Sequence, residues 1–240
     1  MVDLSPGELA SHKIRGRYCV VIPAFNAAKT VGALVRHIKS QGLHAIVVND
    51  GSNDQTAAVA SAEGAFVISH LHNSGKGTAL RSGFQYALRS AYDGIVTMDS
   101  DGQHDPGEIL QLIRAGEIQH AGIVLGNRMS NGVAMPRSRR VTNQLMSAIV
   151  SQLTRQAIPD SQSGFRFIRK EVLQAVPLRA TRFEIETELL LGAARQRWKI
   201  VSIPVRTIYL PAHRSHIHPL WDGLRFMALV LRNLVQRQRR

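Results

Sequence analysis

The chain has 240 residues, of which 44% are apolar and 20% are charged. A chain of this length and apolar content can bury a full core, which argues against intrinsic disorder. Its single cysteine, Cys19, excludes an intramolecular disulfide and a cysteine-based zinc site, and we expect a cytoplasmic protein. No apolar stretch reaches the roughly 18 to 20 residues that cross a bilayer, and residues 1–17 lack the apolar run of a secretory signal. We therefore expect neither a transmembrane helix nor secretion.

The formal net charge of +13 is unevenly distributed. Residues 1–120 hold 10 basic and 11 acidic side chains, a net of −1, whereas residues 121–240 hold 20 and 6, a net of +14. Of these 20 basic residues 18 are arginine, the side chain suited to bidentate recognition of phosphate. This excess is typical of a protein that binds nucleic acid, an anionic membrane surface or a phosphorylated substrate.

The first half alternates short β-branched runs with apolar residues at helical spacing. Helix-length connections between short strands imply right-handed βαβ units and an α/β fold with a Rossmann-like, mostly parallel sheet flanked by helices. The pattern predicts strands at residues 18–22, 45–48, 66–68 and 94–98, and helices at 31–42, from 54, at 78–91 and at 106–119.

The second half is less regular. We expect one domain over residues 18–210, with two halves at about 18–120 and about 121–210. An N-terminal extension covers residues 1–17, and a basic amphipathic extension covers residues 211–240. The pattern predicts strands at residues 123–125, 165–168 and 200–208, with Pro204 at an edge or bulge, and helices at 141–157, 184–195 and 220–234.

The most specific motif, Asp99-Ser100-Asp101-Gly102-Gln103, directly follows the fourth predicted strand. Alternate carboxylates on an extended segment point to one side, and with an amide oxygen they form a site suited to Mg²⁺ or Mn²⁺. A divalent ion there would bridge a diphosphate. A solvated acidic turn that caps the following helix is the alternative explanation.

Three earlier strands also end in polar or glycine-rich turns, at residues 23–26, 49–56 and 72–79. Ligands of open α/β sheets gather at such strand ends. Asp50 is a candidate for accepting hydrogen bonds from a base or ribose, and an Asx turn is its other explanation. Gly75-Lys76-Gly77-Thr78 is not a P-loop, because that motif needs Ser or Thr directly after the lysine.

Taken in order, these turns resemble the motifs of the family 2 inverting glycosyltransferases, which have the GT-A fold. Downstream motifs are most similar to those of the dolichyl- and polyprenyl-phosphate sugar transferases. The resemblance covers about residues 18–222, and it implies a nucleotide-sugar half at about 18–120 and an acceptor half at about 121–210. The motifs are Pro23-Ala24-Phe25-Asn26, Asn49-Asp50-Gly51-Ser52, Asn73-Ser74-Gly75-Lys76-Gly77, Asp99–Gln103, Gly126-Asn127-Arg128, Arg139-Arg140 and Asp160–Phe165.

The resemblance implies a role for each matched residue. The nucleotide sugar would be bound by Pro23, Phe25, Asn26, Asp50, Gly51, Ser52, Lys76, Asp99 and Ser100. Asp99, Asp101 and Gln103 would hold Mg²⁺ or Mn²⁺. The acceptor phosphate would be bound by Arg128, Arg139, Arg140, Asn143 and Ser163. Catalytic roles fall to Asp101, Arg128 and Asp160, with Asp160 a general base where the acceptor is a hydroxyl.

Four positions leave details open. Ala27 and Asn49 stand where the family usually has acidic residues, so the donor is not resolved between a GDP-sugar and a UDP-sugar. Glu184 and Glu186 match the family's acidic helix start, where the helix dipole favours carboxylates regardless of catalysis.

The sequence therefore predicts a metal-dependent inverting glycosyltransferase that moves a sugar onto a polyprenyl phosphate. We expect it at the inner face of a membrane, attached peripherally by its basic C-terminal helix, although a helix packed on the core is the alternative. A sugar or lipid hydroxyl acceptor, or a non-catalytic sugar-nucleotide or RNA-binding module, remains as another reading. We expect no nucleic-acid partner, because only 5% of residues are aromatic and no recognition motif occurs. The sequence does not indicate the oligomeric state.

Overall fold

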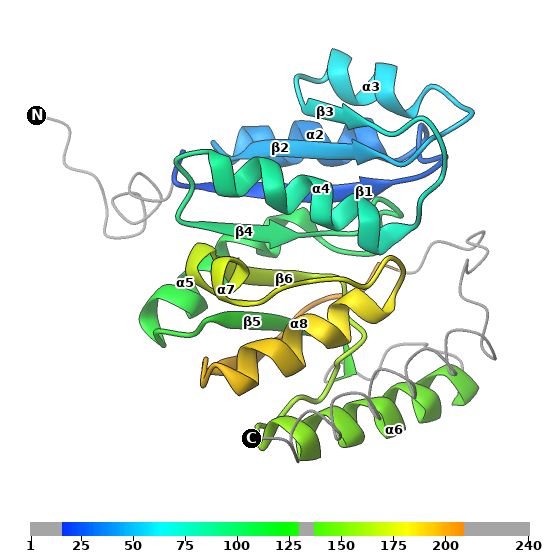
Figure 1. Cartoon of the computed structure of the whole chain (residues 1–240). Helices are drawn as coiled ribbons and strands as arrows, with labels where there is room; N and C mark the ends of the chain where they lie inside the picture. Colours follow the sequence, from blue (N-terminus) through cyan, green and yellow to red (C-terminus); the bar gives the residue numbers. More distant parts are fainter. Residues whose placement is uncertain (1–15, 130–136, 209–240) are drawn as a thin grey trace, which may run out of the picture.

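The computed structural model describes residues 16–129 and 137–208 (Figure 1). The predicted helix at residues 220–234 and the basic extension at 211–240 lie outside the described residues, as do residues 1–15 of the N-terminal extension. Within the described ranges, no helix is both long enough and apolar enough to span a membrane.

A seven-stranded sheet, in the order β3-β2-β1-β4-β6-β5-β7, forms the centre of the molecule (Figure 1). Neighbours pair in parallel except at β6, which is antiparallel to both β4 and β5. All the other strands therefore end at one edge of the sheet. The strands are β1 (Tyr18–Ala24), β2 (His44–Asn49), β3 (Phe66–Ser69), β4 (Gly94–Thr97), β5 (Ile123–Asn127), β6 (Arg166–Arg169) and β7 (Ile200–Pro204).

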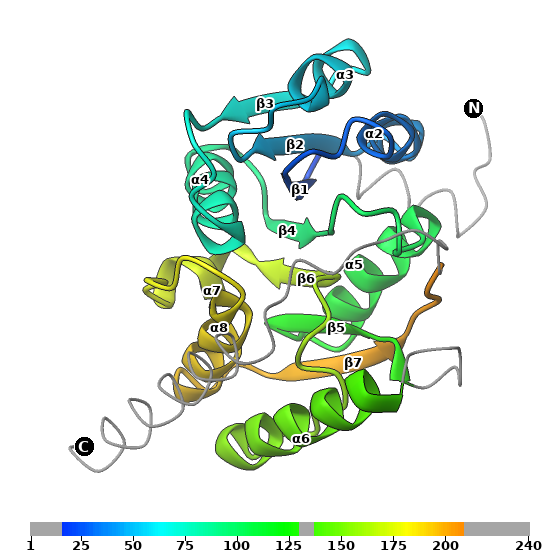
Figure 2. The ribbon, with the colours of Figure 1, turned by 90° about the vertical axis from the view of Figure 1, so that its right-hand side faces the viewer.

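Helices cover both faces of this sheet, as Figure 2 shows from the side. α2 and α5 lie on one face, α4, α7 and α8 lie on the other, and α6 packs against α8. The helices are α2 (Val31–Ser40), α3 (Thr56–Ala62), α4 (Lys76–Arg89), α5 (Ile109–Ile118), α6 (Arg137–Thr154), α7 (Lys170–Ala175) and α8 (Glu184–Arg195), with a 3₁₀ turn, η1 (Pro106–Glu108), before α5.

Burial on both faces explains the unbroken apolar run of β1. Val20 and Ile22 pack into the core beneath α2 and α5, and Cys19 and Val21 pack into the core beneath α4 and α8. A strand covered on both sides needs apolar residues at every position. At Gly83 of α4 a Cβ would lie 2.3 Å from Val21 Cγ1, so glycine allows the helix to approach the sheet closely.

The predicted α/β fold with a mostly parallel central sheet is confirmed. Several boundaries differ. The last strand was expected to reach residue 208 but ends at Pro204, which has no N–H to continue a ladder, and Thr207 forms an isolated bridge with His104. The position of Pro204 on an edge strand is as expected. α6 begins at Arg137 rather than at residue 141, and α7 was not predicted, since six residues are too few for a clear helical period.

The strand order reverses between β1 and β4. In open α/β sheets, ligands bind beyond the carboxyl ends of the strands at such a point. The turns after β1, β2 and β4, which are predicted to bind the nucleotide sugar and the metal, therefore lie at this point of the sheet.

Candidate active site

The turn after β4 holds the predicted metal-binding residues. The Gln103 N–H donates to Asp101 Oδ1 at 3.0 Å, and the Thr30 hydroxyl donates to the Ser100 carbonyl at 2.6 Å. The Asp99 side chain, 27% exposed, is turned toward Lys76. The structure thus places Asp99, Asp101 and Gln103 on one turn. Within residues 16–129 and 137–208, no three His, Cys, Asp or Glu side chains are grouped so that they could hold a metal ion.

Lys76, at the start of α4, links two carboxylates. Its Nζ lies 2.6 Å from Asp99 Oδ1 and 2.8 Å from Glu186 Oε1, and it sits 5.6 Å from the ring centre of Phe183. Burial by itself lowers the pKa of Lys76, but the attraction of Asp99 and Glu186 raises that pKa above its usual value. Lys76 therefore stays protonated and holds both carboxylates in place.

Asp99 is ionised in this setting. Burial by itself raises the pKa of its carboxyl, but the charge of Lys76 and the proximity of His104 hold the pKa well below its usual range. His104 Nε2 lies 3.7 Å from Asp99 Oδ2, and its buried ring packs against Phe165 with 5.1 Å between ring centres. In the sequence, only its place in the same turn points to His104.

Glu186 lies in the first turn of α8. Its sequence position has two explanations, a functional role or a carboxylate that the helix dipole favours. Its side chain is 7% exposed and forms an ion pair with Lys76. Because Lys76 also contacts Asp99, this ion pair places Glu186 near Asp99. Glu186 is therefore part of the site, and the helix dipole alone does not account for it. Glu184 is half-buried in the same turn.

The turns after β1 and β2 are hydrogen-bonded into one unit. The Asn26 N–H donates to Ser52 Oγ at 2.9 Å, and the Asn53 N–H donates to Asn26 Oδ1 at the same distance. Asn26 has φ +52°, a left-handed conformation that asparagine tolerates. Pro23 is buried near the end of β1, and Phe25 is half-buried beside it. This unit borders the predicted nucleotide position.

Asp50 is placed differently from the expectation. Its side chain is almost fully buried, and three donors of the protein bind it: Ser74 N–H at 3.0 Å, Gly75 N–H at 2.8 Å and His70 Nδ1 at 2.7 Å. Asp50 thus supports the loop that leads into α4 rather than presenting its carboxylate to a base or ribose. Gly51, at φ +69°, lies against that loop, where a Cβ would come within 2.4 Å of backbone.

Arg128 and Asp160 form a buried bidentate ion pair. Arg128 Nε lies 2.8 Å from Asp160 Oδ2 and Nη2 lies 3.0 Å from Oδ1, and the Arg128 N–H also donates to Oδ2 at 3.2 Å. Burial by itself raises the pKa of Asp160, but the hydrogen bonds and charge of Arg128 lower it below its usual value. An ionised carboxylate bound at both oxygens is poorly suited to the expected role of general base.

The loop before β6 brings the two halves of the chain together. A Cβ at Gly164 would lie 2.5 Å from Asp99 Oδ2, and the Thr97 hydroxyl donates to the Gly164 carbonyl at 2.8 Å. Ser163 is fully buried next to it. The loop that carries the predicted acceptor residues therefore lies directly against Asp99, the carboxylate predicted to bind the metal.

Arg166 holds this loop, although no sequence motif predicts that role. Its guanidinium is 1% exposed and donates to the carbonyls of Ser161, Ser163 and Glu186 at 2.6–2.7 Å. An arginine in a predicted strand is expected to face solvent, so the contacts of Arg166 are evident only in the folded structure.

The remaining predicted acceptor residues lie on α6. Asn143 is buried and Arg140 is exposed. Arg139 belongs to the same helix, and its side chain lies outside the described residues.

Comparison with known proteins identifies the family. Residues 19–176 match the model of glycosyl transferase family 2. The chain belongs to this family. This confirms the resemblance seen in the sequence, and the chain is a glycosyltransferase with the GT-A fold.

Family 2 relatives include enzymes named for lipid phosphate acceptors. The UDP-N-acetylglucosamine–dolichyl-phosphate N-acetylglucosaminyltransferase of Methanococcus voltae is 30% identical over 213 residues, which cover 79% of this chain and 85% of the relative. The polyprenol monophosphomannose synthase of Mycolicibacterium smegmatis is 29% identical, with coverages of 79% and 76%. The solved structure of glucosyl-3-phosphoglycerate synthase from Mycobacterium tuberculosis with UDP has a TM-score of 0.70 at 23% identity and covers 97% of this chain and 85% of its own.

Proposed function

We propose that this glycosyltransferase moves a sugar, with inversion, from a nucleotide diphosphate sugar to a polyprenyl phosphate. One observation carries the proposal: the loop between the Arg128–Asp160 pair and β6 packs against Asp99, so the arginine that we assign to the acceptor phosphate and the carboxylate that we assign to the metal border one site. Two relatives named for dolichyl phosphate and polyprenol monophosphate support this choice of acceptor.

Asp99 and Asp101 fit a divalent ion. Asp99 is ionised, and both residues offer the hard oxygen ligands that Mg²⁺ and Mn²⁺ prefer. Mg²⁺ is commonly held by one or two carboxylates together with substrate phosphates, which agrees with a turn that offers two carboxylates and Gln103. When bound, such an ion neutralises the charge that develops on the leaving diphosphate. The Mycobacterium tuberculosis neighbour was crystallised with Mn²⁺ and UDP, which supports this assignment.

A phosphate acceptor agrees with the charges of the site. A phosphate monoester is already ionised near neutral pH, so it needs orientation by Arg128 and no general base. Asp160 then fixes the Arg128 guanidinium instead of accepting a proton. A hydroxyl acceptor needs a free base, and both Asp160 and Glu186 are engaged in ion pairs. We further assign Asn143, Ser163, Arg139 and Arg140 to the acceptor.

The donor side consists of the joined turns after β1 and β2. We assign Pro23, Phe25, Asn26, Ser52 and Ser100 to the nucleotide. We assign Asp50, Gly51 and Lys76 to the support of this site, because Asp50 and Gly51 contact the loop before α4 and Lys76 contacts Asp99. Either a UDP-sugar or a GDP-sugar is consistent with this arrangement.

We also propose attachment to the surface of a membrane at its inner face. α6 exposes two apolar side chains one helical turn apart, Val141 at 64% and Leu145 at 62%, next to Arg140. An apolar stripe flanked by basic residues is typical of helices that lie in a membrane interface. The arginine-rich residues 211–240 would add electrostatic attraction to anionic lipid.

The test is transfer from a panel of UDP- and GDP-sugars with and without polyprenyl phosphate, in Mg²⁺ or Mn²⁺ and then in EDTA. We expect a lipid-linked product that requires both the polyprenyl phosphate and the metal. Asp101→Ala should abolish transfer, whereas Asp105→Ala, in the same loop but capping η1, should retain most of it. Transfer to a sugar hydroxyl without lipid phosphate, or turnover that persists in EDTA, would overturn the proposal.

A further inference from the structure

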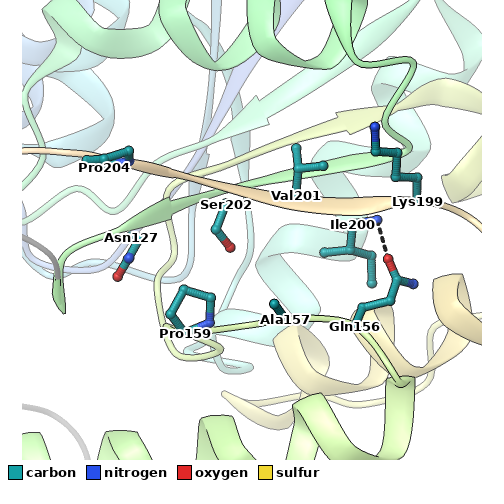
Figure 3. Close-up of a pocket in the computed structure, with 9 residues that line it drawn as sticks. All are labelled: Asn127, Gln156, Ala157, Pro159, Lys199, Ile200, Val201, Ser202 and Pro204. Carbon is teal, nitrogen blue, oxygen red and sulfur yellow. Dashed lines mark hydrogen bonds between the residues drawn. The ribbon is translucent and has the colours of Figure 1, made fainter.

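An open groove of about 630 Å³ runs along β7, the edge strand of the sheet (Figure 3). One wall is β7 itself, and the other is the segment of residues 156–159 that follows α6. Ile200 and Ser202 face this segment, while Lys199 and Val201 point to the opposite side of the strand (Figure 3). The lining is mostly apolar, with Ala157, Pro159 and Ile200 forming its walls.

At one end of the groove, a side chain blocks the pairing of β7 with a further strand. The Gln156 side-chain amide donates to the Trp198 carbonyl at 3.0 Å and accepts from the Ile200 N–H at 2.8 Å. It takes the place that a neighbouring strand would occupy, so this part of the edge is not available for pairing with a peptide. The groove therefore suits a ligand that needs apolar walls rather than backbone hydrogen bonds.

The other end reaches the proposed acceptor site. It is lined by Asn127 and Pro159, which directly precede Arg128 and Asp160 in the chain. Asn127 is in register with Pro204, at the end of two parallel strands that finish at the same edge of the sheet as β4. From Pro204 to Ile200 the strand extends by roughly 13 Å at about 3.3 Å per residue.

We infer that this groove holds the first isoprenoid units of the lipid acceptor, with the lipid phosphate at Arg128. The inference rests on the proposed function and adds the path of the chain. A ligand with an anionic head and an apolar tail matches a groove that has an arginine at one end and apolar walls along its length. The Ser202 hydroxyl oxygen is buried there with no hydrogen-bond partner among the described residues, so removing it tests whether the occupant makes a polar contact at this point.

The test compares acceptors of increasing chain length: dimethylallyl, geranylgeranyl and undecaprenyl phosphate, each in the same detergent. For the wild-type protein we expect KM to fall by about tenfold or more from the first to the second, because more apolar surface is buried. Ala157→Phe should fill the groove and raise KM for geranylgeranyl phosphate by about tenfold, while KM for dimethylallyl phosphate changes by less than about twofold. The matched control is Ala58→Phe, on the exposed side of α3 beyond the opposite end of the sheet, which should leave both values unchanged.

A second variant tests the nature of the occupant. Ser202→Ala removes the unpaired hydroxyl, so KM for geranylgeranyl phosphate should stay equal or fall, whereas a polar occupant would bind more weakly. The inference is overturned if the wild-type KM is independent of chain length, if Ala157→Phe raises KM equally for both acceptors, or if Ser202→Ala raises it for the longer one. A wild-type protein that uses none of the lipid phosphates contradicts the proposed function itself, which is a separate outcome.

Discussion

Paired charges form two groups at the candidate site. Lys76, Asp99 and Glu186 form one group, and Arg128 and Asp160 form the other. Removing charges from water costs several kcal/mol per ion, and replacing a buried ion pair with apolar residues is often neutral or stabilising. Such groups are therefore better explained by function than by stability, and both lie where the donor and acceptor halves meet.

Gly164 allows the loop before β6 to approach Asp99, and replacing it should disturb that carboxylate. In Gly164→Ala the new Cβ would lie 2.5 Å from Asp99 Oδ2, so the carboxylate must move. A displacement of about 1 Å at a catalytic group costs roughly 100-fold, and we expect kcat/KM to fall by about that factor. Steady-state kinetics together with Mn²⁺ affinity would measure both effects. The matched control is Gly107→Ala, whose Cβ would lie 3.1 Å from Asp105, and comparable losses in the two variants would contradict this account.

Asp160→Asn separates orientation from proton transfer. The amide keeps the shape but loses the charge that holds Arg128, so we expect KM for the acceptor phosphate to rise by about tenfold with kcat largely kept. A general base would instead show a fall in kcat of roughly 100-fold or more at unchanged KM. Measuring both constants in the variant decides between these roles.

The same pair also predicts a pH dependence of stability. The pKa of Asp160 in the folded protein is lowered, because Arg128 outweighs the effect of burial. Its contribution to the free energy of unfolding is therefore complete above the unfolded pKa of about 3.9 and is lost as pH falls through the lower folded value. Urea unfolding should show wild type more stable than Asp160→Asn near neutral pH, with the difference shrinking under acid. A difference that stays constant or grows on acidification would refute this assignment.

At the level of elements, the sequence predicted the strands and the turns that follow them, because alternation and turn chemistry are local. It did not predict how the turns contact one another. Asp50 lies 24 residues before Ser74, its hydrogen-bond donor, and nothing in the local pattern announces that contact. Glu186 was recognised as a helix start, but its pairing with Lys76 spans the two halves of the chain.

Arg166 connects three elements and is the clearest case. Its guanidinium joins β6, the loop at residues 160–164 and α8 through three carbonyls. Arg166→Met would leave these buried acceptors unsatisfied, and we expect the free energy of unfolding to fall by about 4 kcal/mol. Urea denaturation measures this loss. Arg169→Met, on the same strand but with a side chain 22% exposed, should lose clearly less, and equal losses would count against a special role for Arg166.

At the scale of the whole molecule, the described residues form one sheet to which two halves of different charge both contribute strands. β4 of the nearly neutral half pairs with β6 of the basic half, and β6 lies between β4 and β5. We therefore interpret the predicted division at about residue 120 as a change of chemistry along one shared sheet. The proposed donor site includes contacts from the acceptor half, since Glu186 and Gly164 both border Asp99 or its lysine partner.

This charge distribution predicts salt-sensitive binding to anionic membranes. Of the net charge, +14 belongs to residues 121–240, and a basic residue near an anionic surface contributes about 1 kcal/mol. The protein should bind vesicles of phosphatidylglycerol and phosphatidylcholine in low salt, and it should dissociate as ionic strength rises above about 0.1 M. Vesicles of phosphatidylcholine alone should bind it weakly.

The location of this attraction is tested by paired variants that remove the same charge from each half. Replacing Arg237 and Arg240 with Gln removes two charges from the basic half, and vesicle affinity should fall by roughly 30-fold, which corresponds to about 2 kcal/mol. Replacing the exposed Lys29 and Arg89 with Gln removes two charges from the other half and should change affinity by less than about twofold. Co-sedimentation over a lipid titration measures both. If the two variants weaken binding equally, net charge alone attracts the protein to lipid, and the C-terminal extension has no special part in the attachment.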